Sequence, residues 1–207
     1  MGVWSDQVVP RLADKMLDVE AVRRARAEVC SGLSGDVLEL GFGSGLNVPH
    51  YPADVTGVWA IDPSDVGRRL AAGRLHDSPV RVDHAGFTAE VLPFPDRRFD
   101  SALSTFTLCT VPDVAVALRE LVRVLVPGGR FHFLEHGRAP DPGVVRWQER
   151  LAPLNRALAG GCHLDRDIAG LLRAAGLEIV ELTTYYGEGP RPFAYRYQGV
   201  ARRPLEA

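Results

Sequence analysis

The sequence predicts an α/β protein with a doubly wound, seven-stranded sheet, mostly parallel, and helices on both faces. Three observations carry this prediction. Short apolar runs alternate with helical patterns over about a hundred residues, a glycine-rich turn (LELGFGSGLN, residues 38–47) follows the first run, and two strand patterns end the chain. With 207 residues the chain is long enough for one well-buried domain and too short for two.

A helical segment precedes the sheet. Apolar residues on one face between residues 8 and 30 predict one or two helices. The charged run RRARAE at residues 23–28 is interpreted as a solvated helix face. We assign residues 1–34 to an N-terminal helical segment that covers the pocket and residues 35–207 to the main domain, so that the chain is a single domain overall.

The elements of the main domain follow in order. Strands are predicted at residues 36–40, 57–62, 80–85, 98–106 and 130–136. Helices are predicted at 63–75, where Ser64 is the N-cap, and at 112–129, ended by Pro127 and Gly128. Beyond residue 137 we expect helices from Trp147 to Leu158 and from Arg166 to Ala175, then an antiparallel strand pair at 176–186 and 191–202.

The glycine turn is the first candidate for a binding site. Ligands of open α/β sheets bind at the carboxyl ends of the strands, beside the point where the strand order reverses. Gly41, Gly43 and Gly45 permit positive φ and close approach of the backbone, and N–H groups of a following helix start can meet a polar ligand. The alternative is that the glycines only form a tight strand-to-helix turn.

Two carboxylates accompany the turn. Asp62 ends the second strand, where a carboxylate can accept both hydroxyls of a ribose; the alternative is a cap or turn before Pro63. Glu39 lies in a strand that should be buried, so it needs a partner. That partner is either backbone N–H groups of the turn or a cationic ligand.

Composition and charge exclude several classes. A net charge of -2 gives no electrostatic case for nucleic-acid binding. Cys30, Cys109 and Cys162 are far apart and form no CxxC pair, which favours a reducing compartment and argues against a structural zinc, so no metal is expected. The N-terminus lacks the apolar core of a signal peptide, and no run could span a bilayer. We therefore expect a cytoplasmic protein without an integral membrane segment; the sequence leaves the oligomeric state open.

Four separated motifs resemble those of the class I S-adenosylmethionine-dependent methyltransferases, of the methyltransferase type 11 domain. They are VLELGFGSG, the ID after the second strand, AEVLPFPDRRFD and LRELVRVLVPGGRF, between residues 35 and 136. GSGLNVPHYP, STFTLCTV, FLEHG and GGCHLDRD are similar to the alkyl-thiol methyltransferases called methyltransferase-like protein seven and their bacterial relatives. The resemblance implies a Rossmann-like fold, S-adenosyl-L-methionine as cofactor and a small-molecule methyl acceptor. The animal relatives begin with a membrane-anchoring segment that is absent here, so association through such an anchor is not expected.

The resemblance also implies a set of cofactor contacts. Gly41, Gly43 and Gly45 should line the methionine and ribose, Asp62 should hold the ribose hydroxyls with Pro63 beside the adenine, Ala89 should offer its backbone to the adenine edge, Ser104 and Thr105 should flank the methionine, and Asn47 should support the turn beside Glu39. Thr88 stands where many family members have an acid that accepts from the adenine amino group. The Thr88 hydroxyl or the neighbouring Glu90 is the expected substitute.

Methyl transfer from a sulfonium is an in-line displacement, so the protein mainly positions the nucleophile and excludes water. Glu135 and His136, at the end of the fifth strand, are the catalytic candidates; the alternative is a structural hydrogen bond at the strand end. The resemblance favours a thiol or hydrogen sulfide as acceptor, with an amine, hydroxyl or lipid head group as alternatives. A nicotinamide-dependent oxidoreductase is disfavoured by the GxGxG spacing, and a non-enzymatic cofactor-binding module stays open.

Overall fold

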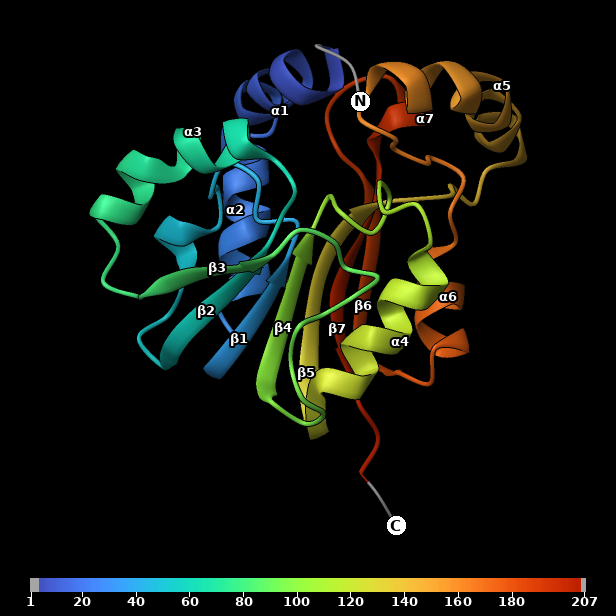
Figure 1. The fold of residues 1–207 in the computed structure, drawn as a ribbon. Helices are drawn as coiled ribbons and strands as arrows, with labels where there is room; N and C mark the ends of the chain where they lie inside the picture. Colours follow the sequence, from blue (N-terminus) through green and yellow to red (C-terminus); the bar gives the residue numbers. More distant parts are fainter. Residues whose placement is uncertain (1–3, 206–207) are drawn as a thin grey trace.

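The computed structural model, which describes residues 4–205, contains one seven-stranded sheet in the order β3-β2-β1-β4-β5-β7-β6 (Figure 1). The strands are β1 (Gly35–Leu40), β2 (Val55–Ile61), β3 (Val82–Gly86), β4 (Phe99–Thr105), β5 (Leu125–His136), β6 (Glu178–Tyr186) and β7 (Tyr195–Arg202). The helices are η1 (Trp4–Val8), α1 (Val9–Met16), α2 (Glu20–Cys30), η2 (Val48–His50), α3 (Asp65–His76), α4 (Val114–Val124), α5 (Pro142–Leu158), α6 (Ile168–Ala174) and α7 (Arg191–Ala194).

The strand order reverses at β1. β1 pairs in parallel with β2 on one side and with β4 on the other, while β7 runs antiparallel to both β5 and β6. The predicted fold class is thereby confirmed, including the antiparallel C-terminal pair. The carboxyl ends of β1 and β4 form the switch point at which open α/β sheets bind ligands.

Helices cover both faces of the sheet because the buried side chains of its strands alternate (Figure 1). Val37 of β1 packs in one apolar cluster together with Val22 and Val29 of α2. Its neighbour Leu38 packs in the other cluster, together with Leu118 of α4. The central strands β1 and β4 are therefore buried on both faces, whereas the edge strand β6 is largely exposed. The end of the sheet that stays open to a ligand is the carboxyl end of the central strands.

Two predicted boundaries are wrong because proline and glycine act locally. The helix predicted to reach residue 129 ends at Val124, and β5 already begins at Leu125. Pro127 disfavours a helical Val126, and Gly128 has a φ of +81°, so the chain turns extended at once. Near the C-terminus, Pro192 starts the single helical turn α7 inside the segment predicted as strand.

Two other helices differ from expectation. Helix α5 begins at Pro142 rather than at Trp147, because a proline in the first turn loses no hydrogen bond there. After β1 the chain forms only the short η2 turn, and the next α-helix, α3, starts at Asp65. The expected strand-to-helix turn at the glycines is therefore a loop, without a helix start directly behind it.

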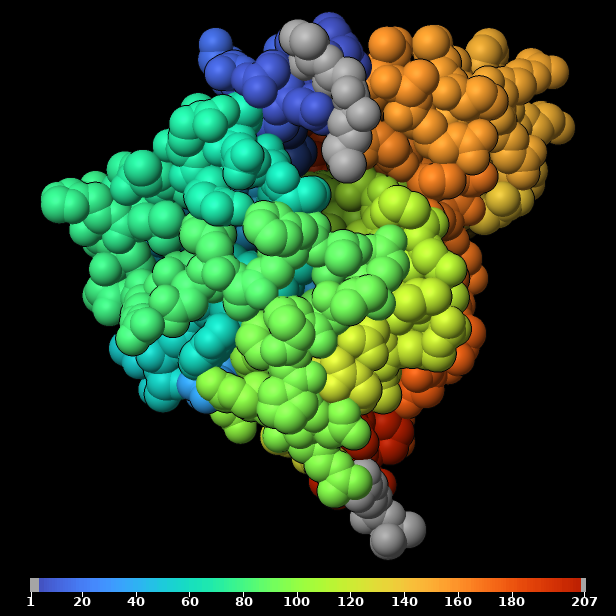
Figure 2. All heavy atoms as spheres, in the orientation of Figure 1, coloured from blue at the N-terminus to red at the C-terminus, as the bar shows by residue number. Residues whose placement is uncertain are grey.

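One end of the molecule carries additional elements. Figure 1 shows α1, α5 and α7 gathered at the end of the sheet to which the β4 arrow points. The space-filling view shows the N-terminal helix and the α5 region at this same end, above the loops of the near face (Figure 2). These elements can enclose whatever binds at the carboxyl ends of the strands.

Candidate active site

A cavity of about 750 Å³ lies at the switch point. Eight of the predicted cofactor residues line it: Gly41, Gly43, Asp62, Pro63, Thr88, Ala89, Glu90 and Thr105. The other four, Glu39, Gly45, Asn47 and Ser104, are not in its wall. The cavity size is within the range of small-molecule and cofactor sites.

The N-terminal segment forms one wall of this cavity. Its contributing residues are Ser5, Asp6, Gln7, Val9, Pro10, Ala13, Asp14 and Leu17. The Arg74 guanidinium on α3 holds this segment, because its Nη1 donates to Asp14 at 3.0 Å and to the Ser44 carbonyl at 2.9 Å. A cover on the pocket was expected from residues 1–34, of which the first three lie outside the described residues.

The three glycines of the turn have different reasons to be glycine. A Cβ on Gly41 would overlap the Thr107 side chain, and one on Gly45 would press on Phe42, Val48 and Ala71 at 3.2 Å. Gly43 has a φ of +55°, yet its Cβ would find no closer heavy atom than the Gly41 carbonyl oxygen at 3.9 Å. A tight turn therefore explains Gly41 and Gly45, whereas Gly43 presents bare backbone to open cavity.

Asp62 has the cap-and-turn role that the sequence offered as the alternative, and its contact with a ribose stays a prediction. Its Oδ1 accepts from the Ser64 backbone N–H at 2.7 Å and its Oδ2 from the Gly43 N–H at 2.8 Å, so it ties the α3 start to the glycine turn. Burial raises the pKa of this carboxyl, against the effect of the two hydrogen bonds. Each carboxylate oxygen keeps a further acceptor position, so Asp62 can also receive ligand hydroxyls.

Asp62→Ala tests that placement. Loss of a charge-assisted contact to ribose hydroxyls costs about 1.5–3 kcal/mol, so S-adenosylhomocysteine should bind roughly tenfold to a hundredfold more weakly. Calorimetry on folded protein measures this, and exposed Asp54→Ala serves as the matched control. Equal affinity of Asp62→Ala and the parent would place the ribose elsewhere.

A buried polar network supports the turn from below. Glu39 is fully buried and accepts from Asn47 Nδ2 at 2.9 Å and from the Tyr51 hydroxyl. Burial raises the pKa of Glu39 to about 7, although these hydrogen bonds oppose the rise. Asn47 Nδ2 also donates to Thr105 Oγ1 at 3.0 Å. The partners of Glu39 are therefore side chains, not the backbone of the turn, and Asn47 links Glu39 of β1 to Thr105 of β4.

Arg26 is the main correction to the predicted site. The run at residues 23–28 is not a solvated face throughout, because Arg26 is only 4% exposed and lines the cavity. Its Nη1 donates to Asn47 Oδ1 at 2.7 Å and to Thr105 Oγ1 at 2.6 Å, while its Nε has no hydrogen-bond partner in the described part of the chain. Helical spacing places Arg26 on the face of Val22 and Val29, which is the signal that could have found it.

Phe106 is a second cavity residue that the sequence did not predict. It follows β4 directly, lines the cavity and has a φ of +55°, a conformation rare for a bulky residue and concentrated at functional sites. Its ring centroid lies 4.7 Å from that of His136, 5.4 Å from Arg26 Cζ and 5.7 Å from Arg196 Cζ. No local sequence pattern predicts the positive φ of Phe106.

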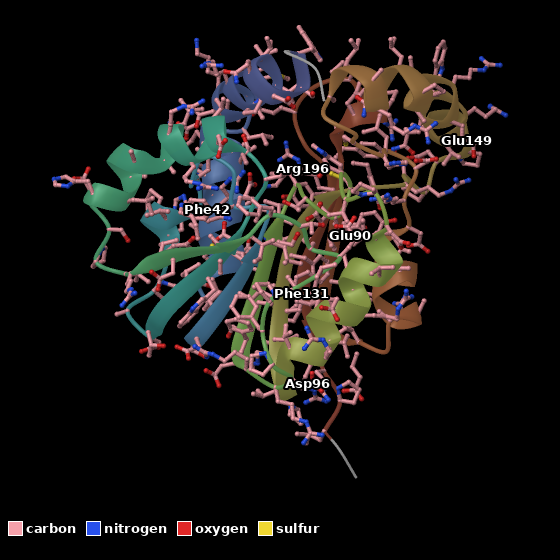
Figure 3. The ribbon with its side chains drawn as sticks, in the orientation of Figure 1. Phe42, Glu90, Asp96, Phe131, Glu149 and Arg196 are labelled. Carbon is pink, nitrogen blue, oxygen red and sulfur yellow. The ribbon has the colours of Figure 1, made fainter. Side chains whose placement is uncertain are left out.

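Figure 3 shows which end of the sheet these side chains occupy. Arg196 and Phe42 lie toward the upper end, whereas Asp96 lies at the opposite end.

The predicted catalytic pair lies beside the cavity, outside its wall. Glu135 is fully buried and accepts from Ser104 Oγ at 2.7 Å and from the backbone N–H groups of Thr107 at 3.0 Å and Cys109 at 3.3 Å. Burial raises the pKa of Glu135 against these hydrogen bonds. These contacts hold the loop after β4, which is the structural role left open above. The catalytic assignments of Glu135 and His136 stay predictions.

The expected adenine side lies at the rim. The Thr88 hydroxyl is bonded to the Glu90 carboxylate, and both residues line the cavity. Phe87 is 66% exposed there, with Arg68 Cζ at 5.8 Å from its ring centroid. An exposed aromatic face next to paired polar groups suits a flat heteroaromatic ring.

The sequence of this region is similar to that of known methyltransferases. The family model described as "Methyltransferase domain" matches residues 38–133. Thiol S-methyltransferase TMT1A of Homo sapiens is 32% identical over 179 residues, which cover 81% of this chain and 72% of that protein. The chain belongs to the S-adenosylmethionine-dependent methyltransferases. The cofactor of this family is S-adenosyl-L-methionine, as the motifs implied.

Other members of the family differ in their acceptors. Thiol S-methyltransferase TMT1B of Rattus norvegicus is 30% identical over 73% of this chain, which spans only 64% of the length of that relative. Phosphatidylethanolamine N-methyltransferase of Cereibacter sphaeroides is 30% identical over 79% of this chain and 80% of its own length. Family membership thus supports methyl transfer more firmly than it supports any one acceptor.

A solved member of the family has the same fold. The N-methyltransferase NodS of Bradyrhizobium japonicum, in complex with S-adenosylhomocysteine, superimposes with a TM-score of 0.69 at 18% identity over 97% of this chain and 95% of its own. Within residues 4–205, no helix combines the length and the apolar character needed to cross a bilayer.

Proposed function

We propose that this chain transfers a methyl group from S-adenosylmethionine to a small-molecule thiol or to hydrogen sulfide. The observation that carries the cofactor part is Gly43, whose backbone borders open cavity beside Asp62 at the switch point. Two thiol S-methyltransferases among the relatives support the thiol part.

The cavity offers suitable groups for each portion of the cofactor. At the methionine end, the Arg26 guanidinium supplies a positive charge for the carboxylate, next to Thr105 and Gly41. Asp62 receives the ribose hydroxyls. At the rim, Phe87 and Pro63 contact the adenine faces, while Thr88, Ala89 and Glu90 offer polar groups to its edge.

When bound, the cofactor supplies an electrophilic methyl group, so the task of the protein is to bind, orient and exclude water. Residues 1–34 act as a cover over a methyltransferase domain formed by residues 35–207. The Arg74–Asp14 ion pair, which joins α3 to α1, anchors that cover against the glycine turn. A cover held in this way would exclude water from the sulfonium of the bound cofactor.

A thiol needs less help from the protein than an amine or alcohol does. The pKa of a free thiol is about 8.5, so a minority is thiolate at neutral pH, and the thiolate is the nucleophile. The Glu135 carboxylate accepts hydrogen bonds from Ser104 and from backbone N–H groups. It therefore does not face the cavity as a general base. We therefore propose that no dedicated base acts and that Glu135 is a positioning residue.

The pH dependence of turnover across thiols of different acidity tests this function. At low substrate concentration the rate should rise with pH and level off near the pKa of each free thiol, because only the thiolate reacts. An acidic aryl thiol should therefore reach its plateau at lower pH than an alkyl thiol. His136→Gln, which keeps a polar group at the strand end, should lower the rate less than tenfold, well short of the roughly hundredfold loss typical of a general base.

Two other results would contradict this function. A limiting pKa that stays the same for all thiols, and disappears in His136→Gln, would make His136 the base. Methylation of ethanolamine lipids or of small amines, with no methylated thiol, would favour the acceptor class of the bacterial relative instead.

A further inference from the structure

Three side chains from distant parts of the sequence meet behind the cavity wall. Cys109 follows β4, His136 ends β5 and Cys162 follows α5, yet their ligand atoms all lie within 4.8 Å of one another. Cys109 and Cys162 are buried and His136 is partly buried. Sequence spacing argued against zinc and missed this cluster, because it forms only when three segments come together in the fold.

The backbone around this cluster is held in place. His163 N–H donates to the Cys109 carbonyl at 2.7 Å, which joins the two cysteine loops. Asn155 Nδ2 donates to the Cys162 carbonyl at 2.7 Å, and Cys109 N–H donates to Glu135 at 3.3 Å. The His136 ring packs against Phe106 at 4.7 Å between centroids. The three side chains therefore converge from fixed supports.

Their chemistry matches one class of ligand. Thiolate sulfur and imidazole nitrogen are the preferred ligands of Zn²⁺, at about 2.3 Å and 2.0–2.1 Å. Tetrahedral coordination puts such atoms roughly 3.4–3.8 Å apart, so ligand atoms that lie within 4.8 Å of one another would approach by at most roughly 1–1.4 Å on binding. Two cysteines and one histidine also occur in zinc sites that keep a fourth position for water.

A bound dication would require both thiols to be ionised, and their two negative charges would neutralise it.

We propose that Cys109, His136 and Cys162 form a binding site for a thiophilic divalent cation, Zn²⁺, that fastens the loop after β4 to the loop after α5. Thr110 and Gly160, which belong to these two loops, line the cavity. The site would thus fix one wall of the cavity. It stands independently of the methyl acceptor.

Metal analysis of the reduced protein tests the site. The protein is loaded with Zn²⁺ and desalted in the presence of a phosphine reductant. Elemental analysis by inductively coupled plasma mass spectrometry should then find about one zinc per chain. Replacement by Co²⁺ should give the near-ultraviolet charge-transfer absorption of thiolate-bound cobalt. Cys109→Ser, Cys162→Ser and His136→Gln should each bind zinc at least about tenfold more weakly, because loss of a ligand should cost no less than loss of a group that only orients one. Cys30→Ser, which changes a buried cysteine elsewhere, should keep full binding.

Stability supplies a second readout. A strong chelator should lower the melting temperature of the zinc-loaded parent and of Cys30→Ser, and should leave His136→Gln unchanged, because a ligand bound only to the folded state stabilises it. Substoichiometric zinc in reduced, folded parent protein would overturn the proposal. So would a parent mass lower by two hydrogens with Cys109 and Cys162 joined in one peptide, which would make the pair a disulfide.

Discussion

Gly43→Val is expected to abolish detectable binding of S-adenosylhomocysteine while the protein remains folded. The valine side chain would project into the space beside Gly43, where a Cβ would lie 3.9 Å from its nearest heavy atom and where the ligand is proposed to bind. The positive φ of +55° adds a backbone cost of about 1–2 kcal/mol, which lowers the melting temperature without unfolding the domain. Calorimetry and circular dichroism measure the two effects separately.

Gly176→Val is the matched control for that variant. Gly176 also has a positive φ, +87°, with nothing within 4 Å of its Cβ position, but it follows α6 rather than β1. It should show a similar loss of stability and unchanged ligand affinity. If Gly43→Val bound S-adenosylhomocysteine as tightly as Gly176→Val, the ligand would lie elsewhere.

Arg26→Met should weaken the binding of S-adenosylhomocysteine far more than the binding of methylthioadenosine, which lacks the amino-acid portion. Removal of one partner of a buried charge pair costs about 2–5 kcal/mol, or roughly thirtyfold to several thousandfold in affinity. Methylthioadenosine cannot contact Arg26 through a carboxylate, so its affinity should change less than threefold. Calorimetric titration of both ligands gives the comparison.

The contrast between ligands separates contact from structure. Arg26 also donates to Asn47 and Thr105, so its loss disturbs the network beneath the turn. A purely structural role would weaken both ligands equally, which would refute the carboxylate assignment. Arg24→Met, an exposed arginine on the same helix that pairs with Glu20, should leave both affinities unchanged.

The sheet could be predicted because its signals are local. Runs such as DVLEL and GVWAID are apolar over the length of one strand, and the GxGxG turn marks where the first strand ends. The helix that was predicted through Pro127 shows the limit of such patterns. Its apolar periodicity continues past Val124, but the extended pairing of Leu125 with Phe99 takes over.

One wall of the cavity could be predicted from the glycine turn and from Asp62, because both follow the ends of strands. Arg26 and Phe106 could not be read as simply. A charged run on an amphipathic helix is normally solvated, and only the packing of α2 against the loop after β1 buries one arginine of that run. The positive φ of Phe106 and the meeting of Cys109 with Cys162 depend on contacts between distant segments.

Methyl transfer to a thiol is the central claim, and one assay tests it directly. The protein is incubated with S-adenosylmethionine labelled on the methyl group and a mixture of thiols, amines and phenols, and the labelled products are identified by mass spectrometry. We expect a labelled methyl thioether. One S-adenosylhomocysteine should form for each methyl group transferred, and Gly43→Val should give no labelled product. Folded protein that binds S-adenosylhomocysteine but yields no labelled thioether would contradict the claim.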